Sequence, residues 1–114
     1  MITGSTQILP GMLDLLILKA VSLQPEHGYG VLLRIGQLSG GALQIEQGAL
    51  YPALYRLVRR GWLTADWGIS ENHQRAKFYQ LTTAGQRRLR EETDAWESLA
   101  AAMATVLKAR LEEA

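Results

Sequence analysis

The last 32 residues of the chain constrain its fold most, because they carry one helical pattern that is too long for the rest of the molecule. Thr83, with Gln86 three residues later, forms a capping box at the start of this pattern. A helix from there to about residue 111 has roughly 28 residues and a length of about 42 Å. A domain built from the preceding 82 residues is narrower than this, so part of the helix must extend beyond it.

The apolar side chains of this long helix indicate what covers its projecting part. They recur at alternating intervals of three and four residues, as in a two-helix seam. Leaving such a stripe in water costs several kcal/mol, at about 25 cal/mol per Å². We therefore expect a dimer interface between two copies of the chain, formed by Leu89, Trp96, Leu99, Met103, Val106 and Leu107. The alternative is a helix that folds back on its own domain.

Three shorter helical patterns precede the long one. Residues 9–23 are mostly apolar and predict a buried helix. Residues 28–38 carry apolar side chains at helical spacing, Val31, Leu32, Ile35 and Leu38. Residues 46–60 carry an inward stripe of Leu50, Leu54, Leu57 and Val58. Gly61 is expected to end this third helix.

A hairpin is predicted between the third helix and the long one. Residues 62–67 and 76–81 are rich in aromatic and alternating side chains, which is typical of short strands. The polar octapeptide GISENHQR between them forms the tip. This order is that of a winged helix. We therefore expect a mainly α fold with a small β-hairpin, comprising a winged helix-turn-helix domain (1–82) and a long C-terminal dimerisation helix (83–114).

Charge is distributed unevenly along the chain, although the net charge is only +1. Residues 48–90 hold eight basic and two acidic side chains, for a net charge of +6, whereas residues 91–114 have a net charge of −4. This division predicts that one surface, formed by the middle of the chain, meets a polyanion such as a nucleic acid. A solvated mixture of charges is the alternative explanation.

Several classes of protein are disfavoured by what the sequence lacks. It has no cysteine, which excludes disulfides, thiol catalysis and cysteine-bound metals. His27 and His73 lack HExxH spacing, and no GxSxG or phosphate-binding loop occurs, so we expect no enzyme, no cofactor and no metal site. No apolar run is long enough to span a membrane, and the N-terminus does not resemble a signal peptide. We expect a cytoplasmic protein with no membrane partner.

Three strings in the chain resemble the motifs of one family. HGYG at 27–30, GALYPALYRLVRRGWL at 48–63 and AKFYQLTTAG at 76–85 occur in that order. In this order and spacing they are similar to the PadR family of bacterial transcription regulators, over about residues 9–90. Ala76 replaces a frequently basic residue and the tip is less basic than in many members, which weakens the expected phosphate contact. The resemblance implies a homodimeric repressor that binds a double-stranded DNA operator.

The resemblance further implies that each subunit places its third helix in a major groove of DNA. The outward face of residues 47–59 carries donors, aromatic rings and guanidinium groups suited to base edges and phosphates. The hairpin would hold the adjacent backbone or minor groove. The predicted DNA contacts are Tyr29, Gln47, Gly48, Tyr51, Pro52, Tyr55, Arg56, Arg59, Asn72, Gln74, Arg75 and Lys77.

Several of these residues also have structural explanations. Tyr51 and Tyr55 are consistent with partly buried core positions, and Arg59 with a cation that satisfies the helix dipole. His27 is expected to cap or pack rather than to sense pH. Some family members bind flat aromatic effectors on a tryptophan of the last helix, so Trp96 is either a small-molecule contact or a plain interface anchor. A winged helix that binds only other proteins, without DNA, is the alternative function.

Overall fold

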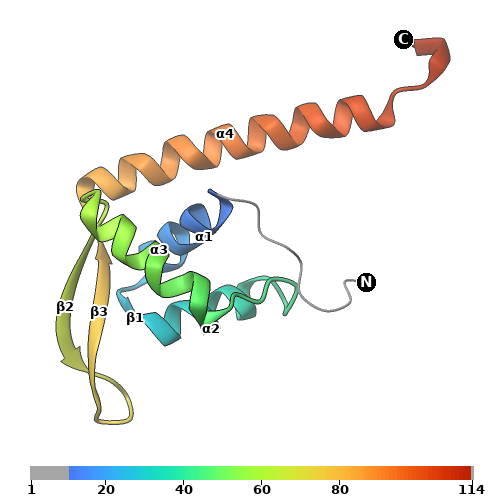
Figure 1. The fold of residues 1–114 in the computed structure, drawn as a ribbon. Helices are drawn as coiled ribbons and strands as arrows, with labels where there is room; N and C mark the ends of the chain where they lie inside the picture. Colours follow the sequence, from blue (N-terminus) through green and yellow to red (C-terminus); the bar gives the residue numbers. More distant parts are fainter. Residues whose placement is uncertain (1–10, 114) are drawn as a thin grey trace.

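The computed structural model describes residues 11–113, which form four α-helices and a small sheet (Figure 1). The bounds of the helices are α1 Met12–Leu23, α2 Gly28–Leu38, α3 Gln47–Arg59 and α4 Thr83–Lys108, with a 3-10 turn at Leu111–Glu113. The strands are β1 Glu26–His27, β2 Leu63–Ile69 and β3 Arg75–Leu81. The start of the predicted first helix and the segment inspected for a signal peptide, both within residues 1–10, lie outside the described residues.

The predicted fold class is confirmed, because three short helices precede an antiparallel hairpin and one long helix follows it. The sheet nevertheless has a strand that the sequence analysis missed. Glu26 and His27, for which no strand was predicted, pair with β3 opposite Tyr79 and Phe78. The sheet is therefore three-stranded, in the order β1-β3-β2. A strand of two residues is too short to show alternation in a sequence.

The hairpin is longer than predicted, and we call residues 63–81 the wing. Pairing runs from Leu63 opposite Leu81 to Ile69 opposite Arg75, so the tip is shortened to residues 70–74. The Ser70 N–H donates to the Gln74 carbonyl (2.8 Å) and closes the tip. The eight-residue prediction is wrong because Gly68, Ile69 and Arg75, at the two ends of that segment, still pair across the hairpin.

One core lies between α1, α2, α3 and the base of the wing. Its largest fully buried side chains are Ile17, Leu18, Val31, Leu50, Leu54, Leu57 and Leu63. The inward stripe predicted for the third helix is confirmed, with Val58 only partly buried at its edge. No polar or charged side chain of the described residues is buried. The polar side chains of residues 11–113 thus stay at least partly accessible to solvent.

The junction between α3 and β2 fixes where the wing starts. Gly61 has φ of 78°, and the Trp62 N–H donates to the Leu57 carbonyl (3.1 Å), which is a Schellman motif. Gly61 therefore ends α3, as predicted. Because the chain turns at once into β2, the wing stands beside α3 (Figure 1).

The start of α4 differs from the predicted capping box. Thr82 is the N-cap: its Oγ1 accepts a hydrogen bond from the Gly85 N–H (2.9 Å) and donates one to the Gly61 carbonyl (2.6 Å). Gly85 is buried, and a Cβ atom there would lie 2.1 Å from the Trp62 carbonyl oxygen. These contacts attach the first turn of α4 to the end of α3.

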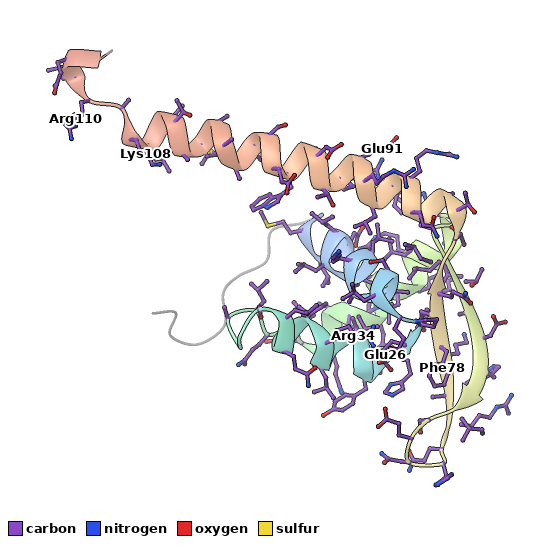
Figure 2. The ribbon with its side chains drawn as sticks, turned by 180° about the vertical axis from the view of Figure 1, so that it is seen from behind. Glu26, Arg34, Phe78, Glu91, Lys108 and Arg110 are labelled. Atoms are coloured by element: carbon purple, nitrogen blue, oxygen red, sulfur yellow. The ribbon has the colours of Figure 1, made fainter. Side chains whose placement is uncertain are left out.

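Beyond its first turns α4 passes over α1 and leaves the domain. The end near Lys108 and Arg110 projects beyond every other element (Figure 2), and the molecule measures 62 × 33 × 21 Å. The helix ends at Lys108, slightly before the predicted residue 111. Within residues 11–113, no helix is both long enough and apolar enough to cross a membrane.

Candidate nucleic-acid interface

A cleft of about 690 Å³ opens between β1, one side of α2, Tyr51 of α3 and the outer part of the wing. We call it the wing cleft. Half of the predicted DNA contacts line it: Tyr29, Tyr51, Asn72, Gln74, Arg75 and Lys77. The structure therefore brings together residues from three separate segments of the sequence, which the motifs alone did not relate in space.

The HGYG string forms the corner of this cleft. His27 caps α2, because its Nδ1 accepts a hydrogen bond from the Gly30 N–H (3.0 Å). A Cβ atom on Gly28 would lie 2.7 Å from the Tyr51 ring, and one on Gly30 would lie 2.3 Å from the Glu26 carboxyl group. Both glycines thus allow neighbouring side chains to pack directly on the α2 backbone. The expectation that His27 caps or packs is confirmed.

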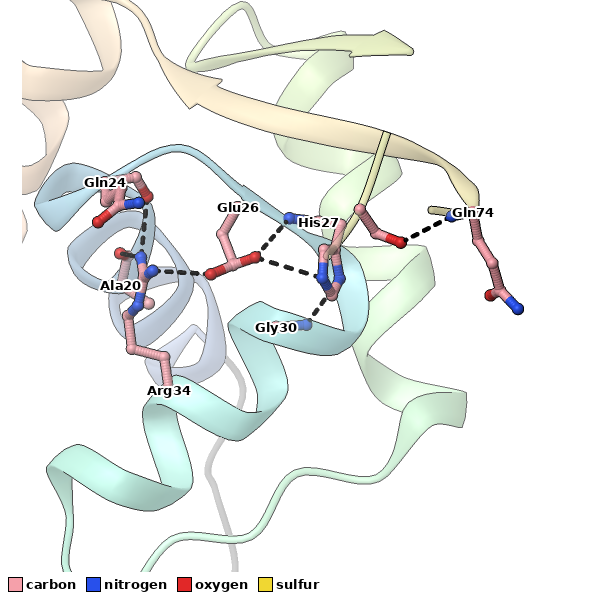
Figure 3. A network of polar contacts seen from close by, with 8 residues as sticks. Ala20, Gln24, Glu26, His27, Gly30, Arg34 and Gln74 are labelled. Carbon is pink, nitrogen blue, oxygen red and sulfur yellow. Dashed lines mark hydrogen bonds and ion pairs between the residues drawn. The ribbon is translucent and has the colours of Figure 1, made fainter. Parts of the chain in front are cut away.

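Glu26 and Arg34 form a polar network behind that corner (Figure 3). The Arg34 guanidinium donates to the Glu26 carboxylate (2.8 Å) and to the carbonyls of Ala20 (2.7 Å) and Gln24 (2.8 Å). The second Glu26 oxygen accepts from the His27 N–H (3.1 Å). The network fixes the end of α1 against the start of α2. It also compensates the negative charge of Glu26 at the cleft wall.

Tyrosines form the floor and rim of the wing cleft. Tyr51 is 46% exposed, so its ring packs on Gly28 while part of it stays open to solvent. The buried Tyr79 lies beside it, and burial raises the pKa of Tyr79, with a smaller contribution from Tyr51. Its hydroxyl therefore stays protonated at neutral pH. Tyr29, at the start of α2, is half exposed at the rim.

The remaining predicted contacts of α3 lie outside the cleft on the solvent side of the helix. All of them are exposed: Gln47, Gly48, Pro52, Tyr55, Arg56 and Arg59. The Arg59 guanidinium lies 5.7 Å from the centre of the Tyr55 ring. This exposed face continues from the cleft along α3, so the two areas form one surface.

Arg56 differs from the other residues of α3 because it has a partner within the chain. Its Nη2 lies 2.5 Å from Oδ1 of Asp14 in α1. The ion pair directs this guanidinium toward α1. The contact of Arg56 with DNA stays a prediction, whereas its contact with α1 is part of the fold.

Sequence reasoning missed Trp67 in the wing. The Trp67 side chain is 59% exposed. The Arg75 guanidinium lies 4.5 Å from the centre of its ring, and the Lys77 Nζ lies 5.8 Å from it. The pairing of Trp67 opposite Lys77 brings these side chains together. The signal was hidden because the strand register is needed to see that the three share one face.

A second depression, the α1–α4 groove, has a volume of about 480 Å³. Trp96 and Leu99 line it from α4, and Asp14 and Leu18 line it from α1. Five of the six predicted interface residues of α4 are exposed, namely Trp96, Leu99, Met103, Val106 and Leu107. Leu89 instead packs against the core of its own chain.

Comparison with known proteins agrees with the fold. A model of the transcriptional regulator PadR-like family matches residues 17–91. An uncharacterised protein of Lysinibacillus sphaericus is 26% identical over 91 residues, which are 80% of this chain and 84% of that protein. A PadR family transcriptional regulator from Eggerthella lenta has a TM-score of 0.74 at 29% identity, covering 88% of this chain and 85% of that one.

A PadR-like transcriptional regulator from Bacillus cereus has a TM-score of 0.78 at 22% identity. The match covers 92% of this chain and 100% of that one, and it is a likeness of fold.

Proposed function

Because the chain belongs to the PadR-like family of transcriptional regulators, we propose that it is a cytoplasmic, homodimeric repressor that binds a double-stranded DNA operator. Members of this family are DNA-binding regulators rather than enzymes. The observation that carries the proposal is the wing cleft, where Tyr51 of α3 faces the same space as Arg75 and Lys77 of the wing, with Glu71 of the tip beside them. A duplex needs such a surface, with groups for base edges next to groups for phosphates.

The proposed contacts divide into two sets. Exposed donors of α3, led by Gln47, Tyr51 and Arg59, would meet base edges and sugars in the major groove. The wing would hold the neighbouring backbone through Asn72, Gln74, Arg75 and Lys77. No ion pair of Arg75 or Lys77 occurs within the described part of the chain, so their charge is available to phosphate.

Dimerisation through α4 is supported by its exposed apolar face. Met103, Val106 and Leu107 lie on the projecting half of the helix, where nothing in the described chain covers them. The α1–α4 groove beside Trp96 offers an apolar surface next to them. We propose that the projecting half of one α4 packs against α1 and α4 of a second copy. Leu89 contributes less to this interface, because its own core already covers part of it.

A small aromatic effector is a finer proposal for the same groove. Trp96 is 43% exposed and lines the groove opposite α1, so one of its faces is accessible to a planar molecule. The competing role of Trp96 is to anchor the second copy. Trp96→Phe separates the two, because it preserves an apolar anchor while reducing the stacking area.

The proposal is tested by titrating labelled DNA from upstream of the protein's own gene, beside a random duplex, at two salt concentrations. We expect tighter binding to the upstream fragment and weaker binding to both at higher salt. Tyr51→Ala should weaken operator binding by about 1–3 kcal/mol, whereas Leu38→Ala, at an exposed position outside the wing cleft, should not. Failure to bind either fragment at low salt would favour the protein-interaction alternative.

The dimer is tested separately by sedimentation. Trp96→Ala combined with Leu99→Ala should shift the protein toward monomer at low concentration. An intact dimer in that variant would contradict the proposed interface and leave DNA binding to be judged from the titration.

A further inference from the structure

The outer wing carries an aromatic ring and two cations that the core does not use. The side chains of Trp67 and Ile69 are exposed, as expected for a hairpin that extends past the domain. Arg75 and Lys77 both lie over the Trp67 ring, at 4.5 and 5.8 Å from its centre. A large apolar side chain at such a position does little to stabilise the fold, so its surroundings suggest another role.

Strand register gives this group a definite orientation. Opposite residues of a hairpin share one face, so Leu63 with Leu81 and Ala65 with Tyr79 face the core at the base of the wing. Farther out, the same face continues with the pairs Trp67–Lys77 and Ile69–Arg75. Arg75, Lys77 and Tyr79 also line the wing cleft. Arg75 and Lys77 therefore lie on the side of the wing that looks into the cleft, and the Trp67 ring, which does not itself line the cleft, lies beside them on the same face.

Stacking on one ring solves a problem that two neighbouring cations create. Arg75 and Lys77 repel each other, and their long side chains are costly to hold in one conformation. An acidic partner would order them, but it would also neutralise the charge that a phosphate needs. The electron-rich face of Trp67 attracts both cations without neutralising either.

We propose that Trp67 is a positioning residue for the DNA backbone: its ring holds Arg75 and Lys77 in place for the phosphates beside the wing cleft. The inference rests on the proposed function, because it assigns the sugar–phosphate backbone of duplex DNA as the occupant. Charge complementarity and continuity with the wing cleft favour this occupant over an apolar protein partner.

The test measures binding to a mixed-sequence duplex of roughly 30 base pairs, about three helical turns, across a series of low salt concentrations. Backbone contacts are independent of sequence, so no operator is required. Trp67→Ala should weaken binding about fivefold and make the salt dependence shallower, whereas Trp67→Phe should restore most of the affinity because it keeps an aromatic face. Circular dichroism should show that each variant is folded.

A double-mutant comparison distinguishes positioning from direct contact. In a background with Arg75→Gln and Lys77→Gln, Trp67→Ala should have almost no further effect, because there is no cation left to position. A fivefold loss that persists in this background would overturn the inference and make Trp67 a direct contact. Unchanged binding by Trp67→Ala in the otherwise native chain would also overturn it.

These outcomes remain distinct from failure of the proposed function. If the unmodified protein binds no duplex at low salt, the DNA-binding proposal fails and the inference fails with it. If the unmodified protein binds and Trp67→Ala binds equally well, the inference alone fails. Leu38→Ala serves as the control for loss of an exposed apolar side chain outside the wing cleft.

Discussion

Two tryptophans in this molecule each lie beside two cations, yet their surroundings differ. Trp62 is partly buried against the core, with the Arg60 and Arg88 guanidinium groups 5.4 and 4.7 Å from its ring centre. Trp67 is exposed on the wing, with Arg75 and Lys77 in the equivalent arrangement. The same ring–cation geometry therefore occurs once at a junction of the fold and once on a surface that faces solvent.

Acidic partners separate the two sites further. Arg88 forms an ion pair with Glu92 one turn along α4, so part of the charge beside Trp62 is compensated within the chain. The wing has no such compensation among residues 11–113. A cation that lies over a ring and also pairs with a carboxylate serves the fold. A cation that lies over a ring without such a carboxylate stays available to an anionic ligand.

The largest effect is expected from Gly85→Ala, which breaks the Trp62 junction. The added Cβ atom would lie 2.1 Å from the Trp62 carbonyl oxygen and 2.9 Å from the Leu81 side chain, and the backbone carbonyl has little room to relax. We expect a loss of unfolding free energy of about 3 kcal/mol, measured by urea denaturation. Gly48→Ala is the matched control, since a Cβ atom there meets nothing within 4 Å. Equal stability of the two variants would contradict the close packing of Gly85.

Removing each tryptophan in turn sharpens the comparison. Trp62→Ala should lower the unfolding free energy by about 2 kcal/mol, because its ring packs partly against the core. Trp67→Ala should change it by less than about 0.5 kcal/mol, because the ring is exposed. Thermal and urea denaturation measure both. Similar losses in the two variants would remove the distinction between a structural and a surface site.

Removing one cation beside Trp67 and one beside Trp62 tests which of the two cations is available to DNA. Arg75→Gln should weaken binding to a mixed-sequence duplex and reduce the slope of log affinity against log salt by about 0.9, the value for one lost phosphate contact. Arg60→Gln removes the same charge outside the wing cleft and should change the slope much less. Equal changes would mean that overall charge, rather than the position of Arg75, governs binding.

The smallest expected effect concerns the carboxylate that completes the Trp62 site. Glu92→Gln removes the partner of Arg88 on a partly exposed helix surface, so the unfolding free energy should fall by about 0.3–0.5 kcal/mol. The effect should diminish at high salt. A loss that does not respond to salt would indicate that Glu92 contributes through packing instead of charge.

The element order could be predicted because the helices and the hairpin carry clear periodicity. Leu50, Leu54 and Leu57 are spaced so regularly that their burial follows from the sequence. The two-residue strand β1 could not be predicted, since its pairing depends on the position of β3. Thr82 and Thr83 are adjacent hydroxyl residues, and only the structure shows that Thr82 accepts the capping bond from Gly85 and is fixed by a tertiary hydrogen bond to Gly61.

The candidate site was predictable residue by residue but not as a surface. The family strings contain Tyr51 and Lys77, the polar tip contributes Arg75, and the structure places all three around one cleft. Arg56 matches the same strings, yet its ion pair with Asp14 joins residues 42 positions apart and leaves no local pattern. Trp67 fits an ordinary strand pattern, and its cation neighbours emerge only from the register.

The attachment of α4 through its N-terminal half, which packs on the core and on α1, makes the projecting half of that helix a lever (Figure 1). Thr82 and Gly85 hold its base, and the remaining helix extends to Lys108, so its 26 residues have a length of about 39 Å. A tilt of about 5° at the base moves the far end by roughly 3 Å, which is comparable to a hydrogen-bond length. Because the base of α4 touches the carbonyl of Trp62 just after α3, we expect a tilt of the helix about that base to displace the backbone beside α3 as well.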